Sequence, residues 1–178
     1  MKKYLALLFF PLVALCQTET QFTAILDGSL TFSRPYWNSP DTFNYSLIEL
    51  QPNVDGLYDI LNPSANLTIS NDPYIYLYQD SFDPIEPTVN LIAYDDDSGG
   101  NLLFQLSGVE FNSQTSYFLV ATSYLPSSTG TFDIVVSGVG SVEFGGSVQN
   151  PTIPEPKMIA IILGFISFSY MIIRKSNL

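Results

Sequence analysis

The 178-residue sequence has no histidine, a single cysteine and only six lysines and arginines against 17 acids. Without histidine, a Ser-His-Asp triad, a Cys-His pair and a histidine-ligated zinc site are all excluded. The one cysteine, Cys16, lies in an N-terminal apolar stretch, so the rest of the chain has neither a thiol nor a disulfide. Carboxylate pairs can serve a glycosidase, but nothing in the sequence marks one pair. We therefore do not expect an enzyme.

Basic residues are also missing from the centre of the chain. Lys2 and Lys3 open the sequence, three further bases flank an apolar run near its end, and Arg34 is the only base between them. The central region is therefore more acidic than the net charge of −11 for the whole chain indicates. Such a surface repels nucleic acid and anionic lipid and attracts divalent cations. No nucleic-acid partner is expected.

Residues 1–16 have the parts of a secretory signal peptide. Two lysines form a positive n-region, and Leu5 to Leu15 form an apolar h-region. Small residues before Gln17 suit cleavage by signal peptidase. Processing as a lipoprotein at Cys16 is disfavoured, because Leu15 stands where that reaction needs a small residue. The sequence therefore predicts a signal helix and export.

The other end of the chain combines a linker, an apolar run and a basic tail. Residues 147–157 are a Pro-rich linker that contains Pro154-Glu155-Pro156, residues 158–173 are uncharged and apolar, and residues 174–178 begin with Arg174 and Lys175. A helix of residues 158–173 is about 24 Å long, which can span a bilayer with local thinning. Positive residues stay in the cytoplasm, so the preceding domain is expected to face outward.

This order of motif, apolar run and basic pair resembles the PEP-CTERM sorting signal of bacteria that make extracellular polysaccharide. The resemblance implies that an exosortase processes the chain near Pro154, Glu155 and Pro156 and removes the transmembrane helix. The protein would first be membrane-anchored and face outward, and would then reach the cell surface or the extracellular matrix. A simple membrane anchor is the alternative interpretation.

Residues 17–146 are predicted to form one all-β domain. No stretch between Gln21 and Phe144 has a 3.6-residue apolar period, whereas short β-rich runs recur between turn formers. The expected strands are residues 21–26, 42–50, 56–61, 66–70, 74–78, 89–94, 102–106, 116–122 and 131–137. Many short strands at close spacing indicate a single antiparallel, jelly-roll-like β-sandwich.

Residues 74–78 and 89–94 are expected to pair as a hairpin. If Tyr76 lies opposite Ile92, then Ile75 and Leu77 face the core, together with Leu91 and Ala93. The opposite face then carries four tyrosines, Tyr74, Tyr76, Tyr78 and Tyr94. An exposed aromatic face can stack on sugar rings, although tyrosine is also a good strand former on a half-buried face.

The same register brings Asp72 to the acidic turn, which we define as Asp95-Asp96-Asp97-Ser98-Gly99-Gly100. Adjacent carboxylates repel one another unless they are neutralised, and hard oxygen ligands suit Ca²⁺. The candidate calcium ligands are Asp72, Asp95, Asp96 and Asp97. The alternative is a solvated turn in which an aspartate caps the bend and the glycines supply positive φ. Trp37, in a loop with Arg34 and Tyr36, is a second candidate anchor for a ligand, and the alternative is that it closes one end of the sandwich.

Four segments, residues 72–84, 90–100, 117–124 and 130–138, together resemble the bacterial pre-peptidase C-terminal domain, in the variant found in PEP-CTERM proteins. The resemblance covers most of residues 22–138. It implies a jelly-roll-like sandwich and a non-catalytic accessory module, and some related domains bind calcium or polymers. We therefore expect an exosortase-sorted surface module that binds or organises exopolysaccharide. The alternatives are a purely structural envelope protein and a small glycan-active enzyme.

Overall fold

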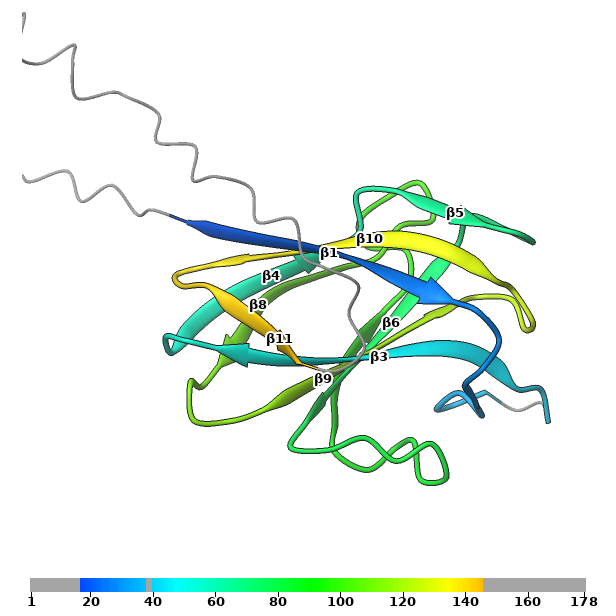
Figure 1. Ribbon diagram of the computed structural model, residues 1–178, viewed down its shortest axis with the longest axis horizontal. Coiled ribbons are helices and arrows are strands. Elements are labelled where there is room, and N and C mark those ends of the chain that lie inside the picture. Colours follow the sequence, from blue (N-terminus) through cyan, green and yellow to red (C-terminus); the bar gives the residue numbers. More distant parts are fainter. Residues whose placement is uncertain (1–16, 38–39, 146–178) are drawn as a thin grey trace, which may run out of the picture.

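The computed structural model describes residues 17–37 and 40–145, which form eleven strands in two antiparallel sheets (Figure 1). The predicted signal helix, Pro-rich linker, transmembrane helix and basic tail lie outside the described residues. Within the described ranges, no helix is long and apolar enough to cross a membrane. The all-β class and the sandwich of two sheets are confirmed.

The two sheets are visible as layers in Figure 1, with β1 and β10 in one and β3 and β9 in the other. The first sheet contains, in order, β1 (Thr18–Leu26), β10 (Gly130–Gly138), β4 (Gly56–Leu61) and β8 (Gln105–Phe111), with β5 (Ala65–Leu67) also paired to β10. The second sheet contains, in order, β11 (Val142–Gly145), β3 (Phe43–Pro52), β9 (Tyr117–Ser123), β6 (Pro73–Gln79) and β7 (Leu91–Asp95), with β2 (Thr31–Phe32) paired to β3.

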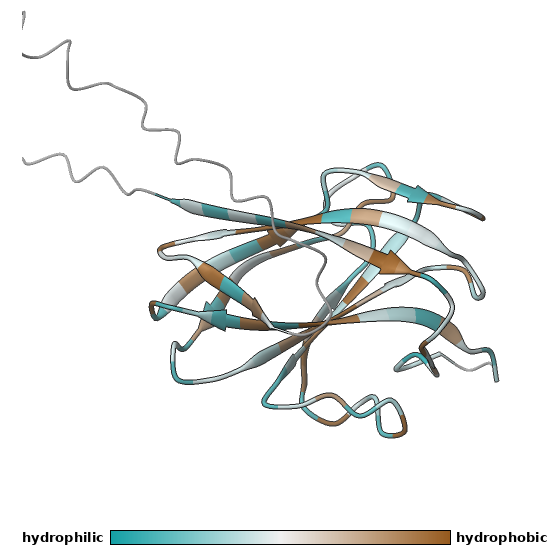
Figure 2. Ribbon diagram, in the orientation of Figure 1, coloured by the Kyte–Doolittle hydropathy of each residue, from teal (hydrophilic) through white to brown (hydrophobic). Residues whose placement is uncertain are grey.

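The main core lies between the sheets and follows from the alternation of side chains along each strand. In β10, Phe132, Ile134 and Val136 are buried, while the residues between them are only partly covered. Hydrophobic and hydrophilic residues alternate in the same way along several strands in Figure 2. Residues 17–145 contain both sheets and this core, so a fragment with these bounds keeps the whole described fold.

A second cluster covers the outer face of the second sheet, and we call it the outer aromatic cluster. Its buried members are Phe32, Phe43, Tyr45, Tyr74, Tyr76, Tyr78 and Val120. Trp37 and Phe82, from the loop segments at residues 33–37 and 80–90, pack against it. Strand β6 is therefore buried on both faces from Pro73 to Tyr78. A strand that is buried on both faces needs apolar or aromatic residues on both faces, and the sequence of β6, Pro-Tyr-Ile-Tyr-Leu-Tyr-Gln, supplies them.

The expected strands were largely found, with two omissions and one displacement. Strands β2 and β11 were not predicted, because runs of two and four residues carry little periodic signal. The strand expected at residues 102–106 begins only at Gln105. Asn101 and Leu102 instead have positive φ, 55° and 62°, and form the turn that directly follows the acidic turn. A leucine in this conformation is not foreseeable from the sequence.

Candidate functional site

The hairpin of β6 and β7 differs in register from the sequence prediction. Tyr76 lies opposite Tyr94, not opposite Ile92, and Leu77 lies opposite Ala93. A bulge after Leu77 then brings Leu91 opposite Tyr78. Ala93 faces the main core as predicted, but Leu91 packs on the outer aromatic cluster. The bulge changes the face of Leu91 because one extra residue reverses the alternation.

The four tyrosines share one face, but the predicted exposed aromatic platform is wrong for three of them. Tyr74, Tyr76 and Tyr78 are only 8%, 1% and 0% exposed, whereas Tyr94 is 49% exposed. The loops that carry Trp37 and Phe82 pack over this face. Burial raises the pKa of Tyr76, and the nearby Arg34 charge partly offsets that rise. These three rings therefore lie beneath the surface and cannot form an exposed aromatic platform.

Arg34 fixes the loop of residues 33–37 onto the sheet. It is 6% exposed, and its Nε donates a hydrogen bond to Tyr76 Oη at 3.0 Å. Its Nη1 donates to the carbonyl oxygen of Tyr124 at 2.8 Å. The guanidinium carbon lies 4.1 Å from the ring centroid of Tyr74, 4.7 Å from that of Phe43 and 4.8 Å from that of Trp37. Hydrogen bonds to neutral oxygens and cation–π contacts stabilise this buried charge.

Trp37 is part of the packing around Arg34. Its ring meets those of Phe43 and Tyr124 edge-on, with centroids 5.5 Å and 5.9 Å apart. Of the two interpretations of Trp37, the geometry therefore favours a packing residue that closes the cluster and disfavours an exposed anchor for a ligand.

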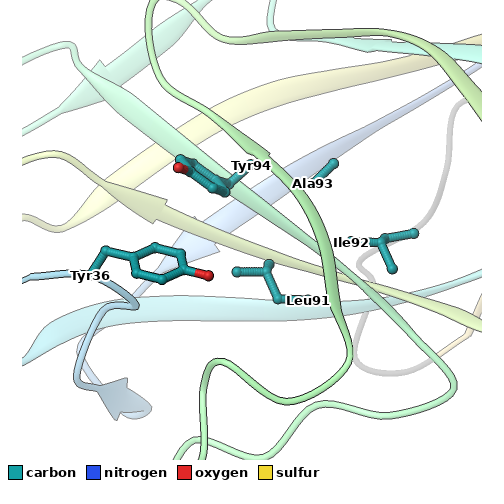
Figure 3. A pocket seen from close by; sticks show the side chains of 5 residues that line it. All are labelled: Tyr36, Leu91, Ile92, Ala93 and Tyr94. Carbon is teal, nitrogen blue, oxygen red and sulfur yellow. The ribbon is translucent and has the colours of Figure 1, made fainter.

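A surface cavity of about 360 Å³ lies beside β7, and we call it the aromatic hollow (Figure 3). It is lined by Tyr36, Leu91, Ile92, Ala93 and Tyr94. Tyr36 and Tyr94 have ring centroids 5.8 Å apart and an interplanar angle of 42°. In Figure 3 the hydroxyl end of Tyr36 points toward Leu91. The hollow thus combines two accessible rings with an aliphatic wall from an edge strand.

The two rings of the aromatic hollow are held differently. Tyr94 stacks on the buried rings of Tyr76, at 5.9 Å, and Tyr74, at 6.4 Å. Tyr36 is 72% exposed and has a φ of 61°, a conformation that bulky residues rarely adopt. The neighbouring Arg34 holds the loop that imposes it. Sequence reasoning named Tyr94 as a ligand residue but missed Tyr36, because nothing in the sequence places its loop beside β7.

The structure brings Asp72 close to the acidic turn. Burial, then the charges of Asp97 and Asp96, raise the pKa of Asp72. Burial, then Asp97 and Asp95, raise the pKa of Asp96. The Oδ1 atom of Asp72 is buried and has no hydrogen-bond partner among the described residues. These carboxylates therefore repel one another in the folded protein.

Asp95 has a different role from its neighbours. Its carboxylate accepts hydrogen bonds from the backbone N–H of Ser98, at 3.0 Å, and of Gln105, at 2.9 Å. It thus caps the acidic turn and ties it to β8. Over residues 17–37 and 40–145, no three acidic residues are grouped in a way that could hold a metal ion.

Asp95 and Asp96 should respond in opposite ways to neutralisation. Asp95→Asn should lower the free energy of unfolding by about 1–2 kcal/mol, because two charged hydrogen bonds weaken. Asp96→Asn should raise the melting temperature at neutral pH. The raised pKa means that the folded state binds the Asp96 proton more tightly, so stability falls as the pH rises from about 3.8 through the folded-state pKa.

The gain from Asp96→Asn should accordingly vanish below that pH window, where the aspartate is protonated in both states. Melting curves of both variants between acidic and neutral pH measure this. If Asp96→Asn melted at a lower temperature than the natural protein at neutral pH, repulsion among these carboxylates would be contradicted.

No family model, curated protein or solved structure matches this chain. The function must therefore be argued from the sequence motifs and from the geometry of the aromatic hollow and the acidic turn.

Proposed function

We propose that this protein is an exported, non-catalytic module of the cell surface or extracellular matrix that binds envelope polysaccharide in the aromatic hollow. The observation that carries the proposal is that two accessible tyrosine rings, Tyr36 and Tyr94, lie against each other in the lining of a surface cavity. The apolar faces of sugar rings stack on aromatic rings, and the hydroxyl groups offer hydrogen bonds to polar groups at the rim. Export and the sorting motif supply the setting in which such a polymer occurs.

Processing of the two ends is the second part of the proposal. Signal peptidase removes residues 1–16, and an exosortase acts near Pro154, Glu155 and Pro156. Replacing these three residues by alanine should keep the chain in the membrane fraction of an exosortase-containing host, whereas the natural chain should lose its tail. Mass spectrometry of the mature termini, with cell fractionation, measures this. Equal release of both chains would contradict exosortase sorting and leave a simple anchor.

Polysaccharide binding can be tested by co-sedimentation of the fragment 17–145 with insoluble polysaccharide from the producing cells. Tyr36→Ala and Tyr94→Ala should each weaken binding about tenfold or more. The estimate is taken from nucleic-acid bases, whose stacking on an aromatic side chain contributes about 1–3 kcal/mol. Leu57→Ala is the matched control, since Leu57 is an exposed apolar residue of the other sheet. Tyr36 is 72% exposed, so its loss should leave the core of the fold intact.

The two alternative functions give different results in that experiment. A purely structural envelope protein would not bind, or would bind equally well after both tyrosine substitutions. A glycan-active enzyme would release soluble sugar from the polysaccharide, and the release would disappear when one pair of acids is removed. We favour the binding module because the hollow presents aromatic rings while the nearest carboxylates gather in the acidic turn.

Calcium is retained as an optional part of the proposal. Asp72, Asp96 and Asp97 are not grouped closely enough here to hold a metal ion, so binding would have to draw their carboxylates together. A divalent cation held in this way would relieve the repulsion that raises the pKa of Asp72 and of Asp96. The Asp96→Asn melting curves, repeated with millimolar Ca²⁺ and with a chelator, test it. If Ca²⁺ raises the melting temperature of the natural protein but not that of Asp96→Asn, the turn is stabilised by calcium. If the natural protein melts at the same temperature with Ca²⁺ and with the chelator, the protein does not bind calcium.

A further inference from the structure

The acidic turn begins directly after Tyr94, the one member of the tyrosine stack that lines the aromatic hollow. Tyr94 is followed directly by Asp95, Asp96 and Asp97 in the chain. Asp96 also lies near Tyr74, whose ring is stacked on that of Tyr94, since the Asp96 charge contributes to the raised pKa of Tyr74. Asp96 and Asp97 therefore lie two and three residues from the exposed Tyr94 ring at the end of β7, next to the aromatic hollow but not in its lining.

No exposed basic side chain among residues 17–145 balances the negative charge, and the buried Arg34 offsets part of it at Asp72. Arg34 is the only lysine or arginine in residues 17–145, and it is 6% exposed. Its guanidinium lies under the ring of Tyr74, with 4.1 Å between its carbon and the ring centroid, and donates its hydrogen bonds inward. A ligand in the aromatic hollow therefore contacts two aromatic rings. The carboxylates that follow Tyr94 in the chain lie beyond this lining, and residues 17–145 offer no exposed lysine or arginine to neutralise them. Both features attract a cation, because the faces of aromatic rings are also negative.

We infer that the aromatic hollow selects sugars that carry a protonated amine, namely 2-amino-2-deoxyhexose units of an unacetylated or partly deacetylated glycan. This inference rests on the proposed function and names its ligand class. The ring face of the sugar lies against Tyr36 and Tyr94, and the ammonium group points toward Asp96 and Asp97. Acidic glycans are rejected, because their carboxylates would face carboxylates of like charge.

Matched oligosaccharides test this selectivity. The fragment 17–145 is titrated calorimetrically with a β-1,4-linked glucosamine hexamer, with the N-acetylglucosamine hexamer of the same linkage, and with a galacturonate hexamer, at a pH where the amines are protonated. The glucosamine hexamer should bind about tenfold more tightly than its acetylated form, and added salt should reduce the difference. The galacturonate hexamer should give no measurable heat.

Substitutions separate a specific site from general attraction to an acidic protein. Asp96→Asn combined with Asp97→Asn should reduce the affinity for the glucosamine hexamer to that for the acetylated form. Glu110→Gln removes one exposed charge from β8 in the other sheet and should change nothing. Tyr36→Ala should weaken both glucosamine-based ligands, since each stacks on that ring.

Three outcomes would overturn the inference. Equal affinity for the amine and acetyl forms, unchanged by the aspartate substitutions, removes the charge selectivity and leaves polysaccharide binding intact. The second outcome is that the glucosamine hexamer still binds after Tyr36→Ala, and that Glu110→Gln weakens its binding as much as the two aspartate substitutions do. The hexamer would then be attracted by the overall charge of the protein. Failure of every oligosaccharide and of the native polysaccharide to bind overturns the inference together with the proposed function.

Discussion

Arg34→Ala is expected to lower the free energy of unfolding by about 3–4 kcal/mol. The substitution leaves the Tyr76 hydroxyl and the carbonyl oxygens of Ser123 and Tyr124 without their donor in a buried place. It also removes the group that the rings of the outer aromatic cluster surround. Urea denaturation of the fragment 17–145, followed by tryptophan fluorescence, measures the loss, and Trp37 reports on this very region.

Two further substitutions separate charge from geometry at this position. Arg34→Lys keeps the charge but has no planar fork that reaches Tyr76 and Tyr124 together, so it should lose nearly as much stability as alanine. Arg34→Met fills the space without burying a charge, so it should lose less. If Arg34→Lys were as stable as the natural protein, the charge alone would suffice, and the assigned role of the fork would be wrong.

Gly130→Ala should be at least as damaging, with an expected loss of about 3 kcal/mol or more. Gly130 has a φ of 130° and lies in β10 between Leu26 of β1 and Leu67 of β5. An added Cβ would collide with the backbone carbonyl oxygen of Asn66 and would lie 3.0 Å from Leu67 Cα. Backbone atoms within a sheet cannot move aside without breaking the strand pairing.

Gly108→Ala is the matched control for that substitution. Gly108 also has a positive φ, 66°, but an added Cβ would have no atom within 4 Å. Only the conformational strain remains, so the loss should be about 1 kcal/mol. Thermal unfolding of both variants, compared with the natural fragment, gives the difference. Equal losses at the two positions would show that crowding at the β10–β5 pair adds nothing.

The strand pattern of the fold was predictable because it depends on local alternation. The sequence of β6 correctly placed Ile75 and Leu77 on one face and the tyrosines on the other. It could not show that loops cover the tyrosine face, because residues 33–42 and 80–90 have the polar, proline-containing composition of ordinary surface loops. Burial on both faces of β6 is a tertiary effect of these loops and of Arg34.

The candidate site was predictable only in part for the same reason. Tyr94 and the proximity of Asp72 to the acidic turn follow from an approximate hairpin register, which tolerates a shift of two residues. The different roles of Asp95 and Asp96 depend on which carboxylate faces the N–H groups of Ser98 and Gln105. Tyr36 joins the site through the buried contacts of Arg34, which link residues far apart in the chain.

The central claim, that the aromatic hollow binds envelope polysaccharide, is tested most directly by amide chemical-shift mapping. Isotope-labelled fragment 17–145 is titrated with soluble fragments of the polysaccharide from the producing cells. The account predicts that the largest shifts lie at Tyr36 and at residues 91–97, and that Tyr36→Ala abolishes them. Saturable shifts confined to the other sheet, or no shifts at any concentration of the polysaccharide, would contradict it.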